Sequence, residues 1–244
     1  YTIKGLSAPL FNVAVSNIKN VKLTDLDYEI TQGAYSGAIV CQLYDGLVEN
    51  CSVEGKININ NTTLAEAAAS YSGVNHGGLV GTLYNHSATN CTNDINITIT
   101  SLVAPEKSLK GAVGGVIGGV SGAENECEFE YLVNNGDITY VGTTQKANVY
   151  ISGIVGKNHD TNGQKDFKVI KNCTNYGKLS TSKDSKNAES ILLCGITGRL
   201  EIAADVVCDK LVNNGALTHN GTVKSMTIGG VSGYSSKASF TNSK

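Results

Sequence analysis

Gly77-Gly78-Leu79-Val80-Gly81 is the stretch of this sequence that decides the fold, because the chain repeats it. Close copies start at Gly114, Ser152, Cys194 and Gly229, and a looser copy, Ser36-Gly37-Ala38-Ile39-Val40, comes before them. A glycine holds the second position of every copy: Gly37, Gly78, Gly115, Gly153, Gly195 and Gly230. These glycines recur every 35 to 42 residues. Self-similarity at such a period is typical of repeat architectures.

A second signature lies between successive copies of the first. It reads NCSVEGKI from Asn50, LVNNGDI from Leu132, NCTNYGKL from Asn172 and LVNNGAL from Leu211, with a shorter version, NCTNDI, from Asn90. A strand-like run follows each copy, most clearly Ile95–Thr100. Strict alternation of apolar and polar residues, rich in β-branched side chains, predicts a β-strand. Each unit is therefore expected to hold short strands separated by glycine and asparagine turns.

A stack of such units is the fold that this pattern favours. One unit alone cannot bury its apolar face, whereas stacked units place like residues above like residues. Asparagine accepts left-handed turns and hydrogen-bonds along a stack. We predict an all-β fold, a right-handed parallel β-helix of about six coils with roughly 40 residues per repeat, which forms a single domain over residues 1–244. A β-sandwich of short strands is the alternative fold.

The expected repeats divide the chain as follows. Residues 1–33 form a degenerate N-terminal rung, and repeats begin near residues 36, 77, 114, 152, 194 and 229, the last one truncated. The sequence starts at Tyr1 and stops inside a repeat. We therefore expect a segment of a longer protein, with further repeats or another chain at its C-terminal end.

The composition excludes some classes of partner. Only 16% of the 244 residues are charged, the formal net charge is −2, and Arg199 is the single arginine. A nucleic-acid-binding protein usually carries a basic surface, so we expect no nucleic acid. No apolar run reaches the roughly 18 residues that a membrane-spanning helix needs, so we expect no membrane span in this segment.

The two signatures together resemble the GLUG-motif repeat family. That family is named for a Gly-Leu-hydrophobic-Gly core, which Gly78-Leu79-Val80-Gly81 matches most closely, and the Leu10-Phe11 pair also looks like part of its units. The resemblance covers nearly the whole chain. It implies an extracellular region, secreted or attached to the cell surface, as in large bacterial surface proteins such as immunoglobulin A peptidases and the adhesin-like proteins of gut bacteria. It implies no catalytic residues.

The cysteines are expected to be buried free thiols. Cys51, Cys91 and Cys173 share one position of the second signature with leucines in the other copies. A position that accepts either cysteine or leucine is one for a small buried hydrophobic side chain. Cys194 stands where other units have glycine or serine. The sequence has no C-x-x-C pair, and its four histidines do not lie at ligand spacing, so we expect no metal site.

Candidate catalytic groups are few. Asp25 and Asp27 lie at strand spacing and could share a face, as the two acids of a glycoside hydrolase must. They could equally be solvated charges. Arg199 has no partner that the sequence identifies, and Glu124, Glu126, Glu128 and Glu130 alternate as they would on one exposed strand face. Because no nucleophile, phosphate-loop or zinc-protease motif is present, we predict a non-enzymatic protein without a cofactor.

Tyrosines are the candidate ligand-binding residues. Tyr44 and Tyr84 lie just past the first signature in adjacent units and could stack on one edge, joined by Tyr234. Aromatic rings suit flat sugar faces, although a tyrosine ladder could also simply cover a strand end. Thr98 and Thr100 alternate as in an ice-binding face, but other units do not maintain the pattern.

The sequence therefore predicts an adhesin-like, cell-surface or secreted repeat module that binds host glycan or a host surface protein. The alternatives are a passive stalk that displays another domain, and a carbohydrate-active β-helix enzyme, either a polysaccharide lyase or a hydrolase.

Overall fold

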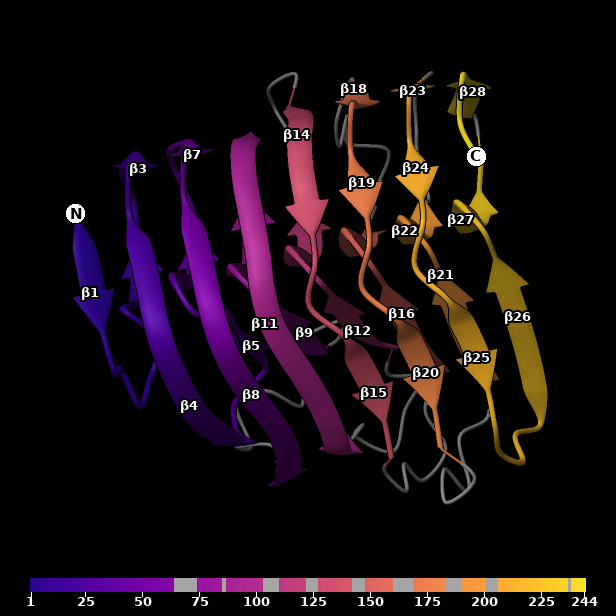
Figure 1. The fold of residues 1–244 in the computed structure, drawn as a ribbon, viewed down its shortest axis with the longest axis horizontal. Helices are drawn as coiled ribbons and strands as arrows, with labels where there is room; N and C mark the ends of the chain where they lie inside the picture. The colour runs from indigo at the N-terminus through magenta and orange to yellow at the C-terminus, as the bar shows by residue number, and fades with distance from the viewer. Residues whose placement is uncertain are drawn as a thin grey trace.

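The computed structural model describes residues 1–63, 74–84, 87–102, 110–121, 127–141, 148–159, 169–182, 190–200, 206–236 and 238–244. These residues form three parallel β-sheets, here called sheets A, B and C, and they contain no helix (Figure 1). The predicted all-β fold is confirmed.

The strands fall into the three sheets as follows. Sheet A holds β1 (Thr2–Lys4), β3 (Ile18–Lys19), β4 (Lys22–Gln32), β7 (Val48–Glu49), β8 (Ser52–Thr63), β11 (Ala88–Leu102), β14 (Glu128–Asn134), β15 (Ile138–Tyr140), β18 (Val169–Lys171), β19 (Thr174–Asn175), β20 (Leu179–Thr181), β23 (Val206–Asp209), β24 (Val212–Asn213), β25 (Leu217–His219) and β28 (Ala238–Thr241). Sheet B holds β2 (Phe11–Ala14), β6 (Val40–Leu43), β10 (Val80–Tyr84), β13 (Ile117–Ser121), β17 (Val155–His159), β22 (Thr197–Leu200) and β27 (Ser232–Ser235). Sheet C holds β5 (Tyr35–Ser36), β9 (Val74–Gly77), β12 (Lys110–Gly114), β16 (Asn148–Ser152), β21 (Ser190–Cys194) and β26 (Ser225–Gly229).

The sheets are the walls of a parallel β-solenoid. Strands one repeat apart are paired in parallel; Ile97, for example, lies opposite Ile138. In Figure 1 the strands of sheet A run downward in front, β26 runs upward behind them, and the chain advances from left to right, so the solenoid is right-handed. Sheet B has seven strands, whereas the first signature has six copies, because β2 adds a strand ahead of the first copy. The coil count thus differs slightly from the prediction.

The first signature forms the corner between sheets C and B. The glycines at its second and fifth positions explain why the pattern is kept. A Cβ on Gly115 would overlap the side chain of Asn134 and the carbonyl oxygen of Gly153 in the next coil. A Cβ on Gly118 would lie 2.6 Å from the backbone of His76 in sheet C. The corner is therefore packed backbone against backbone, which leaves no room for a side chain at either position.

The looser first copy fits the stack with a shift of one residue from the expected alignment. Val40 pairs with Val80 and Ser36 with His76, so Ala38, not Gly37, takes the place of Gly78. In the same coil, Val53 stands opposite Asn93. The coil that tolerates a Cβ at the corner thus lacks the asparagine against which the other corner glycines pack.

A ladder of buried asparagine side chains runs through the solenoid interior. Asn93 donates from Nδ2 to Asn134 Oδ1 over 2.7 Å, Asn134 donates to Asn175 over 2.7 Å, and Asn175 donates to Asn213 over 2.8 Å. Each Nδ2 also donates to a carbonyl oxygen two residues ahead in its own coil. Asparagine stacking, expected from the second signature, is confirmed.

The rest of the interior is aliphatic. Ile57, Ile97, Ile138, Leu179 and Leu217 lie above one another on the inner face of sheet A. Ile95, Ile97 and Ile99 of the alternating run are all buried, as predicted. Burial of apolar area at about 25 cal/mol per Å² is the main stabilising contribution here.

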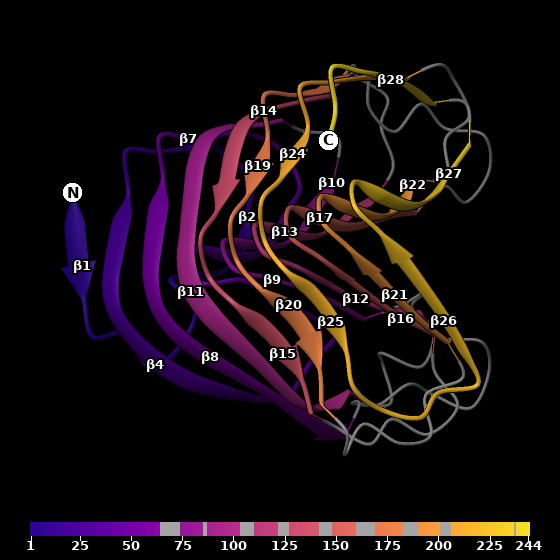
Figure 2. The same ribbon diagram turned by 45° about the vertical axis from the view of Figure 1, so that its right-hand side comes forward.

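Sheets B and C diverge from their shared corner, as β26 and β27 show in Figure 2. Near the corner their outer faces touch: Asn75 in β9 donates from Nδ2 to Thr82 Oγ1 in β10 over 3.0 Å. The tyrosines singled out in the sequence all belong to sheet B: Tyr84 lies in β10, Tyr234 in β27, and Tyr44 directly after β6.

Candidate functional site

Tyr44 and Tyr84 stack on each other, as the sequence suggested. Their ring centroids are 4.5 Å apart and the rings are within 3° of parallel. Leu43 pairs with Leu83, so the two tyrosines follow equivalent positions of β6 and β10. The Tyr44 hydroxyl donates to Gln42 Oε1 over 2.9 Å, and 42% of Tyr44 is exposed. The exposed ring of the pair is therefore that of Tyr44.

Tyr234 is not brought to this pair. It lies in β27, four strands along sheet B from β10. It is also two residues out of step, because it pairs with Arg199, which is in register with Thr82 and not with Tyr84. The Arg199 guanidinium lies 5.0 Å from the Tyr234 ring centroid and donates to the Tyr150 hydroxyl over 3.1 Å. Arg199, in β22, thus contacts one aromatic ring of its own sheet B and one of sheet C.

Tyr35 is the residue of this region that the sequence did not single out. It lies in β5 of sheet C and is close enough to Tyr84 to affect its ionisation. Burial, followed by Tyr35 and then Tyr44, raises the pKa of Tyr84 far above its usual value. The three residues form what we call the tyrosine cluster: Tyr35, Tyr44 and Tyr84.

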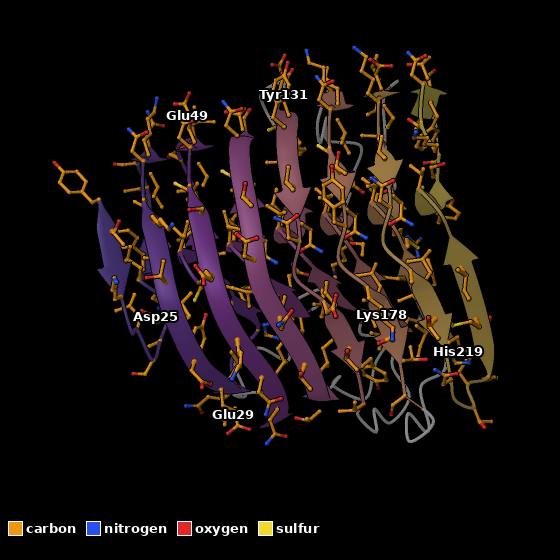
Figure 3. The ribbon with its side chains drawn as sticks, in the orientation of Figure 1. Asp25, Glu29, Glu49, Tyr131, Lys178 and His219 are labelled. Carbon is orange, nitrogen blue, oxygen red and sulfur yellow. The ribbon has the colours of Figure 1, made fainter. Side chains whose placement is uncertain are left out.

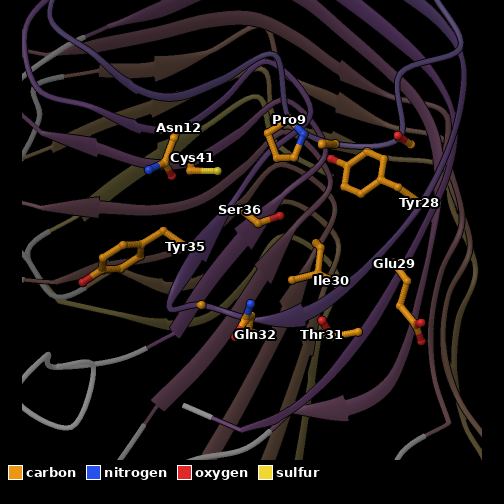
Figure 4. A pocket seen from close by; sticks show the side chains of 13 residues that line it. Pro9, Asn12, Tyr28, Glu29, Ile30, Thr31, Gln32, Tyr35, Ser36 and Cys41 are labelled. Atoms are coloured by element: carbon orange, nitrogen blue, oxygen red, sulfur yellow. The ribbon is translucent and has the colours of Figure 1, made fainter. Parts of the chain in front are cut away.

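A pocket lies beside the tyrosine cluster, at the N-terminal end of sheet C (Figure 4). Its volume is about 410 Å³, which is within the usual range of small-molecule sites. The lining residues come from β2 and the segment before it, from β4 and β5 with Gly33 between them, and from Cys41 in β6. Tyr35 lines the pocket, so the pocket and the tyrosine cluster are continuous.

Among the described residues that line this pocket, two have a buried hydroxyl group without a hydrogen-bond partner. These hydroxyls are Tyr28 Oη and Ser36 Oγ, whose residues are 7% and 3% exposed. Burial raises the pKa of the Tyr28 hydroxyl, and burial also raises the pKa of the Cys41 thiol. The Tyr28 hydroxyl and the Cys41 thiol are therefore neutral. The Tyr28 and Ser36 hydroxyls are available to hydrogen-bond a bound molecule.

A second pocket of about 410 Å³ lies on the outer face of sheet A. Asp25 and Asp27 line it together with Glu54, Lys56 and Asp94, so three neighbouring coils contribute carboxylates. Figure 3 shows Asp25 on this face, with Lys178 further along the solenoid. The carboxylates are partly engaged: Asn135 donates from Nδ2 to Asp94 over 2.7 Å. We call this the acidic pocket.

The alternating glutamates lie only partly in the described residues. Glu124 and Glu126 are outside them. Glu128 is exposed in β14, and Glu130 forms an ion pair with Lys171 of the next coil. The visible part of the run is an ordinary charged strand face.

All seven cysteines are free and buried. Cys91 pairs with Leu132, which is the cysteine–leucine exchange that the second signature shows. Burial raises the pKa of the Cys173, Cys194 and Cys208 thiols to about 12, so these thiols are unreactive at neutral pH. Among the residues that the structure describes, no cluster of His, Cys, Asp and Glu side chains is suited to a metal ion.

His76 and His219 differ sharply in environment. His76 is fully buried with both ring nitrogens unpartnered, and burial lowers its pKa to about 4. His219 Nδ1 lies 2.7 Å from Thr181 Oγ1. His86 and the side chain of His159 lie outside the described residues.

Comparison with known families identifies one repeat unit. The family model described as the GLUG motif matches residues 32–58. Residues 32–58 resemble a GLUG motif. The GLUG motif here spans β5, β6, β7 and the start of β8, which is one passage through sheets C, B and A. It falls on the looser copy with Ala38 and not on the Gly78-Leu79-Val80-Gly81 copy, and it contains Tyr35, Ser36, Cys41 and Tyr44 of the site described above.

No curated protein and no solved structure gives a significant match to the chain. In the described part of the chain, no helix has the length and apolar character needed to cross a membrane.

Proposed function

We propose that this chain is a non-enzymatic repeat module of a secreted or cell-surface protein, adhesin-like in use, and that it binds a glycan at the tyrosine cluster. The carrying observation is the half-exposed Tyr44 ring, held by its stack on Tyr84 beside a pocket with unpartnered hydroxyls. An aromatic ring with a fixed orientation and nearby hydrogen-bonding groups suits a sugar, which has an apolar face and polar edges.

A glycan array tests this proposal, with the wild-type chain compared with Tyr44→Ala and Tyr44→Phe. Tyr44→Ala removes the exposed ring, and we expect at least a tenfold loss of binding, whereas Tyr44→Phe keeps the ring and most of the affinity. Tyr176→Ala is the matched control, because Tyr176 is similarly exposed, at 56%, and lies in the second signature, away from the cluster. Equal binding by Tyr44→Ala and wild type would remove the cluster from the site.

The alternative of a carbohydrate-active enzyme has one observation in its favour, the acidic pocket with Asp25, Asp27, Glu54 and Asp94. A pair of carboxylates facing one cleft is what glycoside hydrolysis needs. Release of reducing ends from polysaccharides that the array identifies, lost in Asp27→Asn, would establish this alternative in place of the non-enzymatic proposal.

The passive stalk is the third possibility, supported by the ladders of asparagine and of aliphatic side chains, which join neighbouring coils. This possibility requires that the folded wild-type chain bind no glycan on the array.

A further inference from the structure

The two unpartnered hydroxyls point into the same space. Figure 4 shows the Tyr28 hydroxyl directed toward the middle of the pocket from one side and the Ser36 side chain directed toward it from the other. A buried hydroxyl without a partner destabilises the folded protein. A molecule in the pocket that both donates and accepts hydrogen bonds would satisfy both groups, since each hydroxyl can do either.

The other walls of the pocket define the charge of that molecule. Pro9, Ala8 and Ile30 provide apolar surface, and Asn12 and Gln32 provide amides. Among the described residues of the lining, Glu29 is the only charged one, and its Oε1 already accepts from Asn58 Nδ2 at 3.0 Å and from Asn60 Nδ2 at 2.9 Å. None of these described side chains is a cation that could neutralise a carboxylate, sulfate or phosphate. The pocket therefore suits an uncharged ligand with several hydroxyl groups.

The pocket lies at the end of the described part of sheet C. Its walls are β2 and the segment before it, β4, β5 at the end of that sheet, and Cys41 of β6. Tyr35 lines the pocket and is close to Tyr84, which stacks on Tyr44. A chain-like ligand can thus insert one end while its remainder lies along the tyrosine cluster.

We propose that this pocket receives the terminal, uncharged sugar residue of the glycan, held by hydrogen bonds to Tyr28 Oη and Ser36 Oγ, and that the module therefore recognises glycan ends. This inference rests on the proposed glycan-binding function. It adds the class of ligand, a neutral terminal saccharide, and the two residues that select it.

The test uses an array that carries neutral glycans and the same glycans capped by sialic acid or glucuronic acid. We expect the wild-type chain to retain the neutral set and to lose it on capping. Ser36→Ala and Tyr28→Phe each remove one hydroxyl and little volume, and we expect each to weaken binding at least tenfold. The matched control is Ser152→Ala, because Ser152 Oγ is also buried and unpartnered but lies in β16, away from the pocket.

Thermal unfolding of each variant shows that the chain is folded, and we expect Ser36→Ala to be at least as stable as wild type, since it removes an unsatisfied group. Neutral glycans that bind equally to wild type, Ser36→Ala and Tyr28→Phe would overturn the pocket and leave glycan binding intact. Preference for the capped glycans would also overturn the pocket. Retention of no glycan by the folded chain would overturn both proposals.

Discussion

His76 is an ionisable residue placed where only a neutral one is stable. Its ladder neighbours in sheet C include Ser36 on one side and Val113 on the other, and no hydrogen bond reaches its ring. Burial lowers its pKa from 6.5 to about 4. The unfolded chain therefore takes up a proton at a higher pH than the folded chain does.

Stability should accordingly fall as the pH drops from about 6.5 to about 4. The contribution of His76 is fully present above the unfolded pKa, and about 3 kcal/mol of it is lost once the pH has fallen through the folded pKa. Urea unfolding at a series of pH values measures this. His76→Leu should flatten the dependence, and aliphatic residues hold that position in later coils. The same slope in His76→Leu as in wild type would contradict the argument.

Tyr131 has a strained backbone conformation. One residue at the corner before each inner cysteine or leucine has positive φ, and it is usually asparagine, as at Asn90 (φ 51°) and Asn172 (φ 54°). Tyr131 takes this conformation with φ 54° and an exposed side chain. A left-handed conformation costs residues other than glycine and asparagine roughly 1–2 kcal/mol.

Tyr131→Asn should therefore stabilise the protein by about 1 kcal/mol, which for a chain of this size is an increase of roughly 2–4 °C in Tm. Calorimetry measures the change. Tyr176→Asn makes the same substitution at an exposed tyrosine that is not among the positive-φ residues, and it should bring no gain. Equal shifts in the two variants would mean that the side chain, not the backbone, sets the effect.

At the scale of elements, the asparagine ladder joins coils by side chains as the strands join them by backbone. Asn134 is central: it accepts from Asn93 and donates to Asn175 and to the Gly136 carbonyl. Asn213 is the last member and has no asparagine after it in the ladder. The two residues thus have the same chemistry with different numbers of partners.

Asn134→Ala should cost about 3 kcal/mol, because it leaves a buried donor on Asn93 and a buried acceptor on Asn175 without partners. Asn213→Ala should cost only about 1 kcal/mol, since its side chain is partly exposed and bonded on fewer sides. Urea unfolding of both variants gives the comparison. A smaller effect at Asn134 than at Asn213 would show that the ladder is not a stabilising element.

Much of this element pattern could be predicted from the sequence. Five of the six glycines assigned to the second position of the motif lie at that position of the corner, and the asparagine stack and the strand at Ile95–Thr100 follow from period and residue type. The register of the first copy could not be predicted, because Gly37 and Ala38 are both small and only strand pairing separates them. The position of Tyr234 along its strand was predicted wrongly. Tyr234 follows its motif glycine, Gly233, by one residue, whereas Tyr84 follows Gly81 by three.

The pocket also lay beyond sequence reasoning. Tyr28 and Ser36 belong to different sheets and meet only because the chain bends between β4 and β5 at the end of sheet C. Nothing in their spacing of eight residues indicates a shared cavity, and neither carries a motif. Tyr35, one residue before the first signature, was the available signal for the aromatic part of the site.

At the scale of the whole molecule, cohesion is local, because each coil contacts its neighbours and few residues beyond them. The last coil is poorly covered: Ile228 is 51% exposed and Phe240 is 38% exposed, although the equivalent residues of the preceding coil, Leu193 and Cys208, are buried. The interior coils have a neighbour on both sides.

Hydrogen exchange should therefore be graded along the axis. Amides of β12, β13 and β11 should exchange slowest, and those of β26 and β27 fastest, because terminal units open without unfolding the centre. Exchange followed by mass spectrometry resolves the segments. A single exchange class for all strands would instead indicate one cooperative unit.

The parallel pairing has a mechanical consequence. The backbone hydrogen bonds between coils point along the long axis of the solenoid, so a pull on its two ends loads one coil boundary at a time instead of shearing many bonds together. Each coil that comes away, with a register of 41 residues as between Cys91 and Leu132, releases roughly 140 Å of extended chain. Under tension the molecule would lengthen in steps, one coil per step. It would thereby dissipate a sudden load while the remaining coils keep any ligand that they have bound.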